Sequence, residues 1–278
     1  MAPSVAFMAP TPLVRRARAG RAMSIGVGPR PRSVLPSRVG RDVHSTAKVS
    51  MASSSLNELF VNNLEWSKKM TDQDENYFSQ HVGGQTPEYL WIGCSDSRVP
   101  ANLIVGLPPG ALFVHRNVGN VVSHSDLNVL SAIEFSVKVL KVRHILVVGH
   151  DYCGAVTAAM NDERVGVVDH WLTHIRDIRR RHAVQLSQIE DYELRRDRLV
   201  QLNVLEQVHN TCATPAVQAA WNAGQPVSVH GWIYRLQDGL VRDLGFRVDG
   251  PEGIDTVYRT VEPRVLSGKG KLPEVSEV

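Results

Sequence analysis

The stretch "YLWIGCSDSRVP", residues 89–100, gives the strongest indication of the fold. An apolar run ends at Cys94, and Asp96 and Arg98 follow it at alternate positions. Successive side chains of an extended chain point to opposite sides, so these three polar groups share one side of the segment. A thiol, a carboxylate and a guanidinium are seldom brought together for packing. The stretch therefore predicts a buried strand that delivers reactive side chains at its carboxyl end.

Three further apolar runs have the length of buried strands, and helix-length segments separate them. The runs are "LFVHRN" at 112–117, "HILVVGH" at 144–150 and "VSVHGWIY" at 227–234. Short apolar strands that alternate with helices are typical of an α/β fold whose mostly parallel sheet is covered on both faces. We expect a central sheet of about four strands plus an edge strand over 240–248, flanked by helices.

Apolar residues at helical spacing predict the flanking helices. The clearest helix covers 127–140 and follows Asp126, a natural N-cap. A helical N-terminal arm is expected from Ser55 onward, ahead of a short helix over 72–81. Further helices are expected at 169–182, 199–210 and 214–223.

Charge is distributed unevenly along the chain, whose formal net charge is +3. Residues 1–50 hold eight arginines and Lys48 but a single acidic residue, Asp42. The rest of the chain is mildly acidic, which argues against nucleic acid as a partner. No apolar run reaches the roughly 18 residues of a membrane span, so no membrane partner is expected.

The first 41 residues are rich in arginine and contain no acidic residue, a composition typical of an organellar transit peptide. We therefore expect a transit peptide or disordered segment over 1–53, one folded catalytic domain over 54–265 and a C-terminal tail over 266–278. The arginine density favours a mitochondrial address. A chloroplast is the alternative, and Met51 offers a second start for a cytosolic form. The three cysteines do not form a disulfide framework, which agrees with a reducing compartment.

Three side chains of metal-binding type stand at the ends of predicted strands. Cys94 closes the first strand, His150 closes the third, and Cys153 follows His150 by three residues. In open parallel sheets, ligands lie beyond the carboxyl ends of the strands. Two thiolates and an imidazole suit zinc, and three protein ligands leave the fourth tetrahedral position open, as in catalytic sites. The sequence thus predicts a catalytic metal site.

Asp96 and Arg98 gain a role beside such a metal. A carboxylate within hydrogen-bond reach can orient a zinc hydroxide and handle its proton. An arginine that binds the carboxylate through two hydrogen bonds keeps it ionised and away from the metal. Without the cysteines, the same pair would be read as an incidental ion pair on a surface turn.

The motifs "CSDSR" at 94–98 and "GHDYCG" at 149–154 resemble those of the β-class carbonic anhydrases, Cys-x-Asp-x-Arg followed by His-x-x-Cys. The likeness extends over roughly 55–260. It includes the stretches "FVHRNVGN", "HWLTHIRDI", "LNVLEQV" and "HGWIY", which fall in the order and spacing of the bacterial-type branch. The chain looks like an organelle-targeted, eukaryotic-like form of that branch.

The resemblance implies a zinc lyase that reversibly hydrates CO₂ to bicarbonate and a proton. One Zn²⁺ per subunit would be bound by Cys94, His150 and Cys153, and zinc hydroxide would attack CO₂ in an apolar pocket. Asp96 and Arg98 would form the catalytic pair, with Asp96 as a conditional fourth ligand in a closed state. Relatives form homodimers, which are often paired into homotetramers.

The resemblance also implies which residues line the substrate pocket, one of them reaching it from the partner subunit. The partner's contribution would be a glutamine, and the full set is Gln85, Phe113, Val118, Phe135 and Gly154. The family usually has two glycines after the second cysteine, whereas here the second position is Ala155. We expect its methyl group to leave the metal ligands in place.

Some bacterial-type relatives carry a noncatalytic bicarbonate site built from a tryptophan, an arginine and a tyrosine. Trp91 and Arg116 match the first two positions, and His209 is expected where the tyrosine stands. This exchange argues against regulation by bicarbonate at that site.

Two other functions fit the same residues. Close relatives hydrolyse CS₂ or COS on the same type of site, and the motifs alone do not separate these substrates from CO₂. Alternatively, Asp96 as a permanent fourth ligand would give a structural or regulatory zinc in a binding protein. Arg98 argues against that alternative, because it would then have no partner.

We predict that the first 55 residues direct import into an organelle, because they are rich in arginine and almost free of acidic residues. A fusion of residues 1–55 to a fluorescent reporter should colocalise with a mitochondrial marker. The same fusion with its arginines replaced by glutamine should stay in the cytosol. A diffuse signal from the unaltered fusion would contradict the prediction.

Overall fold

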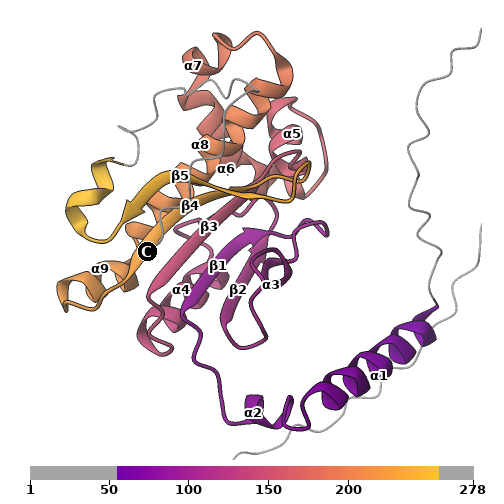
Figure 1. The fold of residues 1–278 in the computed structure, drawn as a ribbon. Coiled ribbons are helices and arrows are strands. Elements are labelled where there is room, and N and C mark those ends of the chain that lie inside the picture. The colour runs from indigo at the N-terminus through magenta and orange to yellow at the C-terminus, as the bar shows by residue number, and fades with distance from the viewer. Residues whose placement is uncertain (1–54, 257–278) are drawn as a thin grey trace, which may run out of the picture. The chain divides into compact units, whose positions relative to one another are not determined.

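The computed structural model describes residues 55–256, so the expected transit segment and the C-terminal tail lie outside it. Its centre is a five-stranded sheet with the order β2-β1-β3-β4-β5 (Figure 1). The first four strands are parallel, and the last runs antiparallel to its neighbour. The strands are β1 (Tyr89–Cys94), β2 (Leu112–Asn117), β3 (His144–His150), β4 (Ser228–Tyr234) and β5 (Val241–Val248). The predicted fold class is thus confirmed.

The described residues form helices at five of the expected positions, together with three short helices that were not expected. The helices are α1 (Leu56–Gln73), α2 (Ser79–Val82), α3 (Ala101–Ile104), α4 (Leu127–Lys138), α5 (Gly154–Met160), α6 (Val168–Arg181), α7 (Ala183–Ser187), α8 (Tyr192–Cys212) and α9 (Pro215–Asn222), with a 3₁₀ helix at Pro251–Thr256. The predicted N-cap is confirmed, because the Asp126 carboxylate accepts a hydrogen bond from the Asn128 N–H. The helix expected over 72–81 is wrong: α1 continues to Gln73, and only the short α2 follows. Among the described residues, no helix is both long and apolar enough to cross a membrane.

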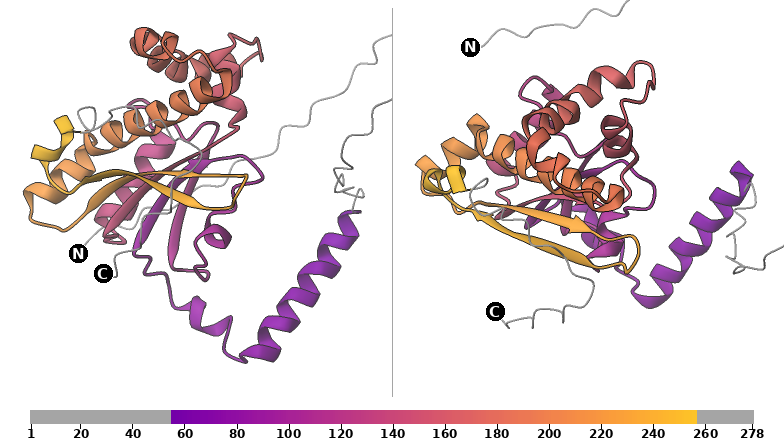
Figure 2. Two further views of the ribbon diagram at one scale, coloured as in Figure 1. Left: turned by 45° about the horizontal axis from the view of Figure 1, so that its top comes forward. Right: turned by 90° about the horizontal axis from the view of Figure 1, so that it is seen from above.

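The two faces of the sheet are covered unequally. Alternate strand residues such as Leu90 and Ile92 pack into the main core together with α4, α5, α6, α8 and α9. Figure 2 shows α8 running along this face. Trp91 points the other way into a smaller cluster, to which α3 contributes Ala101. Helices were expected on both faces, but among the described residues the second face carries little more than α3.

The register of the parallel strands places their carboxyl ends at one edge. Cys94 at the end of β1 pairs with Asn117 at the end of β2, and His150 ends β3 beside Tyr234 of β4. Side chains and loops that follow these strands therefore converge, although they are far apart in the sequence.

Close packing of α8 against β3 depends on Gly149. A methyl group at this position would lie 2.6 Å from Val204 Cγ2 and 3.4 Å from Val200 Cγ1, both on α8. The helix therefore lies directly over the strand that ends in His150.

We predict that Gly149→Ala lowers the free energy of unfolding by about 1–3 kcal/mol, because the added methyl group pushes α8 from the sheet. Urea denaturation followed by circular dichroism measures the change. Gly83→Ala is the matched control, since a methyl group there meets nothing within 4 Å. Equal stability of the two variants would contradict this account of the packing.

Candidate metal centre

Three buried side chains converge at the carboxyl edge of the sheet. Cys94 ends β1, His150 ends β3, and Cys153 is the N-cap residue of α5. Their ligand atoms all lie within 4.8 Å of one another, and the two sulfurs are 4.0 Å apart. Among the described residues, this is the one group of three or more such side chains close enough to hold a metal ion. The structure therefore brings together all three predicted ligands.

The state of His150 shows that the group suits a metal. Its Nδ1 lies 2.8 Å from the Asp151 carbonyl oxygen, which accepts its hydrogen. In the neutral ring this leaves the lone pair on Nε2, and that atom is buried without a hydrogen-bond partner. Two thiolates at tetrahedral angles on zinc, each about 2.3 Å from the metal, lie roughly 3.8 Å apart, close to the observed separation. The orphaned nitrogen, the spacing and the ligand types all fit Zn²⁺.

Without a cation, the two thiols compete for one proton. The hydrogen bond from Cys153 lowers the pKa of Cys94, and contacts with His150 and the Gly119 N–H add to this effect. The same bond and burial raise the pKa of Cys153, although N–H groups of the first turn of α5 oppose the rise. The pair thus holds one negative charge next to the His150 ring. A divalent cation that displaces the remaining proton satisfies all three groups.

Asp96 and Arg98 form a bidentate ion pair beside the three ligands. The Arg98 Nε donates to Asp96 Oδ1 at 2.9 Å, and Nη2 donates to Oδ2 at 2.8 Å. These hydrogen bonds hold the pKa of Asp96 well below its usual range, so the carboxylate stays ionised at neutral pH. Asp96 Oδ2 also lies 3.8 Å from His150 Nε2, which places it next to the metal position.

Two further residues hold this pair, and the sequence motifs did not reveal their roles. Arg116 donates to the carbonyl oxygens of Cys94 and Asp96, so it fixes the turn between them. The Tyr152 carbonyl accepts a hydrogen bond from Arg98 Nη2 at 3.3 Å. Tyr152 has a φ of 52°, in the left-handed region that favours glycine.

The strained Tyr152 is clamped at its ring and at its hydroxyl. The Arg196 guanidinium lies 4.1 Å from the ring centre, and Gln237 Nε2 is 2.6 Å from the phenol oxygen. Arg196 lies on α8, and Gln237 follows β4. These contacts offset a backbone conformation that places the Tyr152 carbonyl within reach of Arg98.

Known proteins are similar to this chain in sequence and in fold. A family model described as carbonic anhydrase matches residues 89–241. A carbonic anhydrase of Emericella nidulans is 45% identical over 193 residues, which cover 69% of this chain and 85% of that protein. A β-carbonic anhydrase structure from Coccomyxa, in complex with acetazolamide, has a TM-score of 0.69 and 43% identity over 73% of this chain and 91% of that one. One of two tetrameric β-carbonic anhydrases from Sordaria macrospora reaches a TM-score of 0.67 and 38% identity, over 69% of this chain and 98% of that one.

The chain belongs to the β-class carbonic anhydrases. The pocket residues expected from this family fall into two groups in the structure. Val118 follows Asn117 at the metal end of β2, and Gly154 begins α5 next to Cys153. A methyl group at Gly154 meets nothing within 4 Å, and the neighbouring Ala155 packs into the main core, so the departure from two glycines is accommodated.

The other pocket residues of the β-carbonic anhydrase pattern lie away from this chain's own metal centre. Phe113 pairs with Leu90, four residues and about 13 Å before Cys94 along the strand direction. The Phe135 ring lies 5.8 Å from the Phe113 ring. Gln85 is exposed in the loop that precedes the amino end of β1. Within a single chain, these three side chains therefore do not lie beside that chain's metal-binding residues.

The structure does not assemble the expected noncatalytic bicarbonate site. Trp91 packs in the smaller cluster. His209 lines a hollow of about 760 Å³ whose walls include Val121 and Val122 of the main core. The tryptophan and the histidine therefore lie on opposite sides of the sheet. The prediction that His209 occupies the tyrosine position of this site is wrong. The phenol that shares the face of Trp91 is Tyr234, at the end of β4.

We predict that purified full-length protein holds about one zinc per subunit, and that Cys153→Ala loses most of it. The buried Cys153 sulfur supplies one of only three protein ligands, so two remain in the variant. Metal analysis after dialysis measures the content. Cys212→Ala is the matched control, because this cysteine is equally buried but belongs to no ligand group. Full zinc retention by Cys153→Ala would show that the ligand assignment is wrong.

Proposed function

We propose that this protein reversibly hydrates CO₂ to bicarbonate and a proton. The observation that carries the proposal is the buried Cys94–His150–Cys153 group with the Asp96–Arg98 pair beside its open side. Zinc bound to the three ligands would supply a nucleophilic hydroxide at near-neutral pH. The family relationship supports the same reaction.

The protein's own residues contribute orientation and charge. Both oxygens of Asp96 are engaged by Arg98, so the ionised carboxylate is held in one direction and can accept a hydrogen bond from the attacking oxygen. Val118 is 41% exposed next to the metal end of β2, where its apolar surface suits a substrate without charge. CS₂ and COS have the same linear shape, and assays with these substrates test the alternative hydrolysis.

Asp96 also provides a switch between an open and a closed metal site. In the structure it is bound to Arg98, yet its Oδ2 is only 3.8 Å from His150 Nε2. Its lowered pKa keeps it a carboxylate at neutral pH, so it would compete for the fourth position of a bound metal. Solvent oxygen is the stronger competitor when it is deprotonated. The open site, with the Asp96–Arg98 pair intact, is therefore favoured as pH rises.

A second copy of the chain would complete the substrate pocket. Phe113, Phe135 and Gln85 lie at the far end of β1 and β2 from their own metal ligands, and β2 is an edge strand. Phe135 is 43% exposed. The helix α1 buries none of its residues, and its apolar Phe60 side chain is 75% exposed. Exposed apolar side chains of this kind mark interaction surfaces. We therefore propose a homodimer or homotetramer whose subunits share their pockets.

We predict that Arg98→Ala retains zinc but loses nearly all CO₂ hydration, because the released Asp96 occupies the fourth position. Stopped-flow hydration assays and metal analysis on the full-length protein measure both properties. Arg180→Ala is the matched control, since this arginine is exposed on α6 and pairs only with Asp177 among the ion pairs described. Near-normal turnover in a zinc-loaded Arg98→Ala protein would rule out the coupled role of the pair.

We also predict that the activity of the unaltered protein rises with pH more steeply than one titration allows, because proton loss is coupled to the departure of Asp96 from the metal. The Asp96 carboxyl itself does not titrate in this range, since its pKa is lowered further below neutrality by Arg98. A pH–rate profile from about pH 6 to 9 measures the slope. A profile that follows a single protonation curve would contradict the switch.

A further inference from the structure

Two fully buried carboxamides on α8 connect this helix to the loop after β2. Asn203 and Gln207 are each 1% exposed, in a helix whose other buried residues are mostly apolar. Gln207 Oε1 accepts a hydrogen bond from the Val122 N–H at 2.8 Å, and its Nε2 donates to Asn203 Oδ1 at 3.0 Å. Asn203 Nδ2 in turn donates to the Gly119 carbonyl oxygen at 2.9 Å. Each amide thus bonds to the loop and to the other amide, and Gln207 Oε1 also accepts a hydrogen bond from Asn210 Nδ2 of the same helix at 3.3 Å.

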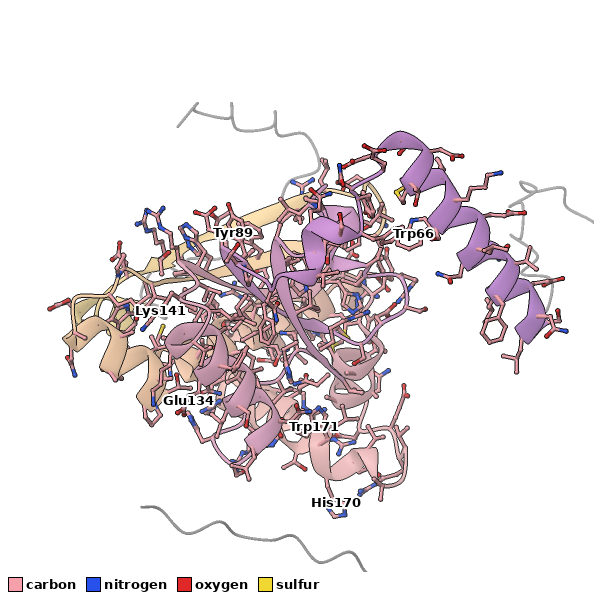
Figure 3. The ribbon with its side chains drawn as sticks, turned by 90° about the horizontal axis from the view of Figure 1, so that it is seen from below. Trp66, Tyr89, Glu134, Lys141, His170 and Trp171 are labelled. Atoms are coloured by element: carbon pink, nitrogen blue, oxygen red, sulfur yellow. The ribbon has the colours of Figure 1, made fainter. Side chains whose placement is uncertain are left out.

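The same loop is anchored from two other directions. Trp171 of α6, labelled in Figure 3, donates from Nε1 to the Val118 carbonyl at 2.6 Å. The Asn117 side chain bonds both the N–H and the carbonyl of Val121, at 2.8 and 2.7 Å. The backbone from Val118 to Val122 is therefore held by side chains rather than by a regular element. Such a framework fixes the direction of each peptide group.

These contacts orient the peptide group between Val118 and Gly119, whose N–H lies 3.4 Å from the Cys94 sulfur. Gly119 has a φ of +79°, and a methyl group on it would lie 2.9 Å from Ile175 Cδ1 and 3.2 Å from the Ala155 methyl group. The loop can approach Cys94 this closely because residue 119 is glycine. The Gly119 carbonyl is fixed by Asn203 while its N–H faces the metal ligand.

We propose that Asn203 and Gln207 are positioning residues that hold the Gly119 N–H against the Cys94 sulfur and thereby tune this zinc ligand. A hydrogen bond to a thiolate withdraws negative charge from the sulfur. A metal with two thiolate ligands is largely neutralised, so this bond leaves more of its positive charge for the atom in the open position. The two amides, about one helical turn apart, thus connect the interior of α8 to the electronic state of the metal.

This inference rests on the proposed function only in that Cys94 binds the metal. Its test is therefore read from the loop and from the metal, separately from turnover. Asn203→Leu and Gln207→Met are close in shape to the natural residues but cannot form the hydrogen bonds. Thr211→Val is the matched control, because Thr211 is buried on the same helix and its hydroxyl donates to the Gln207 carbonyl rather than to the loop.

The experiment uses the full-length protein loaded with zinc or with cobalt. In Asn203→Leu we expect deuterium uptake in peptides covering 117–122 to be about 10-fold faster, because the loop loses its anchor. We expect the sulfur-to-cobalt absorption band to shift and zinc affinity to fall by about 10- to 100-fold. Gln207→Met should change the same three quantities in the same direction but less, since it removes the outer support.

Thr211→Val should match the unaltered protein in all three measurements. If Asn203→Leu and Gln207→Met also match it, the positioning role is wrong. Should Asn203→Leu not fold, Gln207→Met alone decides by the same criteria. A wild-type zinc protein that fails to hydrate CO₂ would overturn the proposed function but leave these measurements interpretable, whereas normal hydration with unchanged spectra in both variants would overturn only this inference.

Discussion

The buried His150 Nε2 sets the main constraint on this structure. It has no hydrogen-bond partner, and it faces two sulfurs that are 4.0 Å apart. An imidazole nitrogen and two thiols enclosed in this way are costly in a protein interior unless a cation binds them. The parallel sheet makes the arrangement possible, because the ends of β1 and β3 lie side by side while their sequences are more than fifty residues apart. The sheet, the turn at Tyr152 and the start of α5 all serve this convergence.

The features that the sequence predicted are those determined locally. Continuous apolar runs located the strands, because a strand buried on both faces has few polar positions. The strand-end positions of Cys94 and His150, together with Cys153 three residues after His150, predicted the group of metal-binding side chains, since parallel strands place their carboxyl ends together. The pairing of Asp96 with Arg98 was predicted from their alternation in an extended chain, but β1 ends at Cys94, and a turn in which the Arg98 N–H donates to Asp96 Oδ1 brings the two side chains together.

Features that depend on distant contacts were not predictable in this way. The short α3 and α7 carry too few residues for a periodic pattern. The clamp of Arg196 on Tyr152 joins α8 to the metal loop and has no local signature. His209 lies on the opposite side of the sheet from Trp91 because α8 covers that side. The pattern of apolar residues in a single strand does not specify which face a helix covers. The stretch "LNVLEQV" did contain a signal, because two carboxamides on the buried side of a helix require partners.

The two thiolate ligands illustrate how differently a helix and a strand support a metal. Cys153 stands at the start of α5, where the N–H groups of Val156 and Ala155 lower the pKa of its thiol, against the larger rise caused by Cys94 and by burial. Cys94 ends a strand, so its sulfur relies on N–H groups that follow the strand: the Asp96 N–H of its own turn and one from another loop. Gly119 supplies the second of these, but an irregular loop holds its direction only if its other polar groups are fixed. The buried amides of α8 meet that requirement, which explains why polar side chains are retained in the centre of an otherwise apolar core.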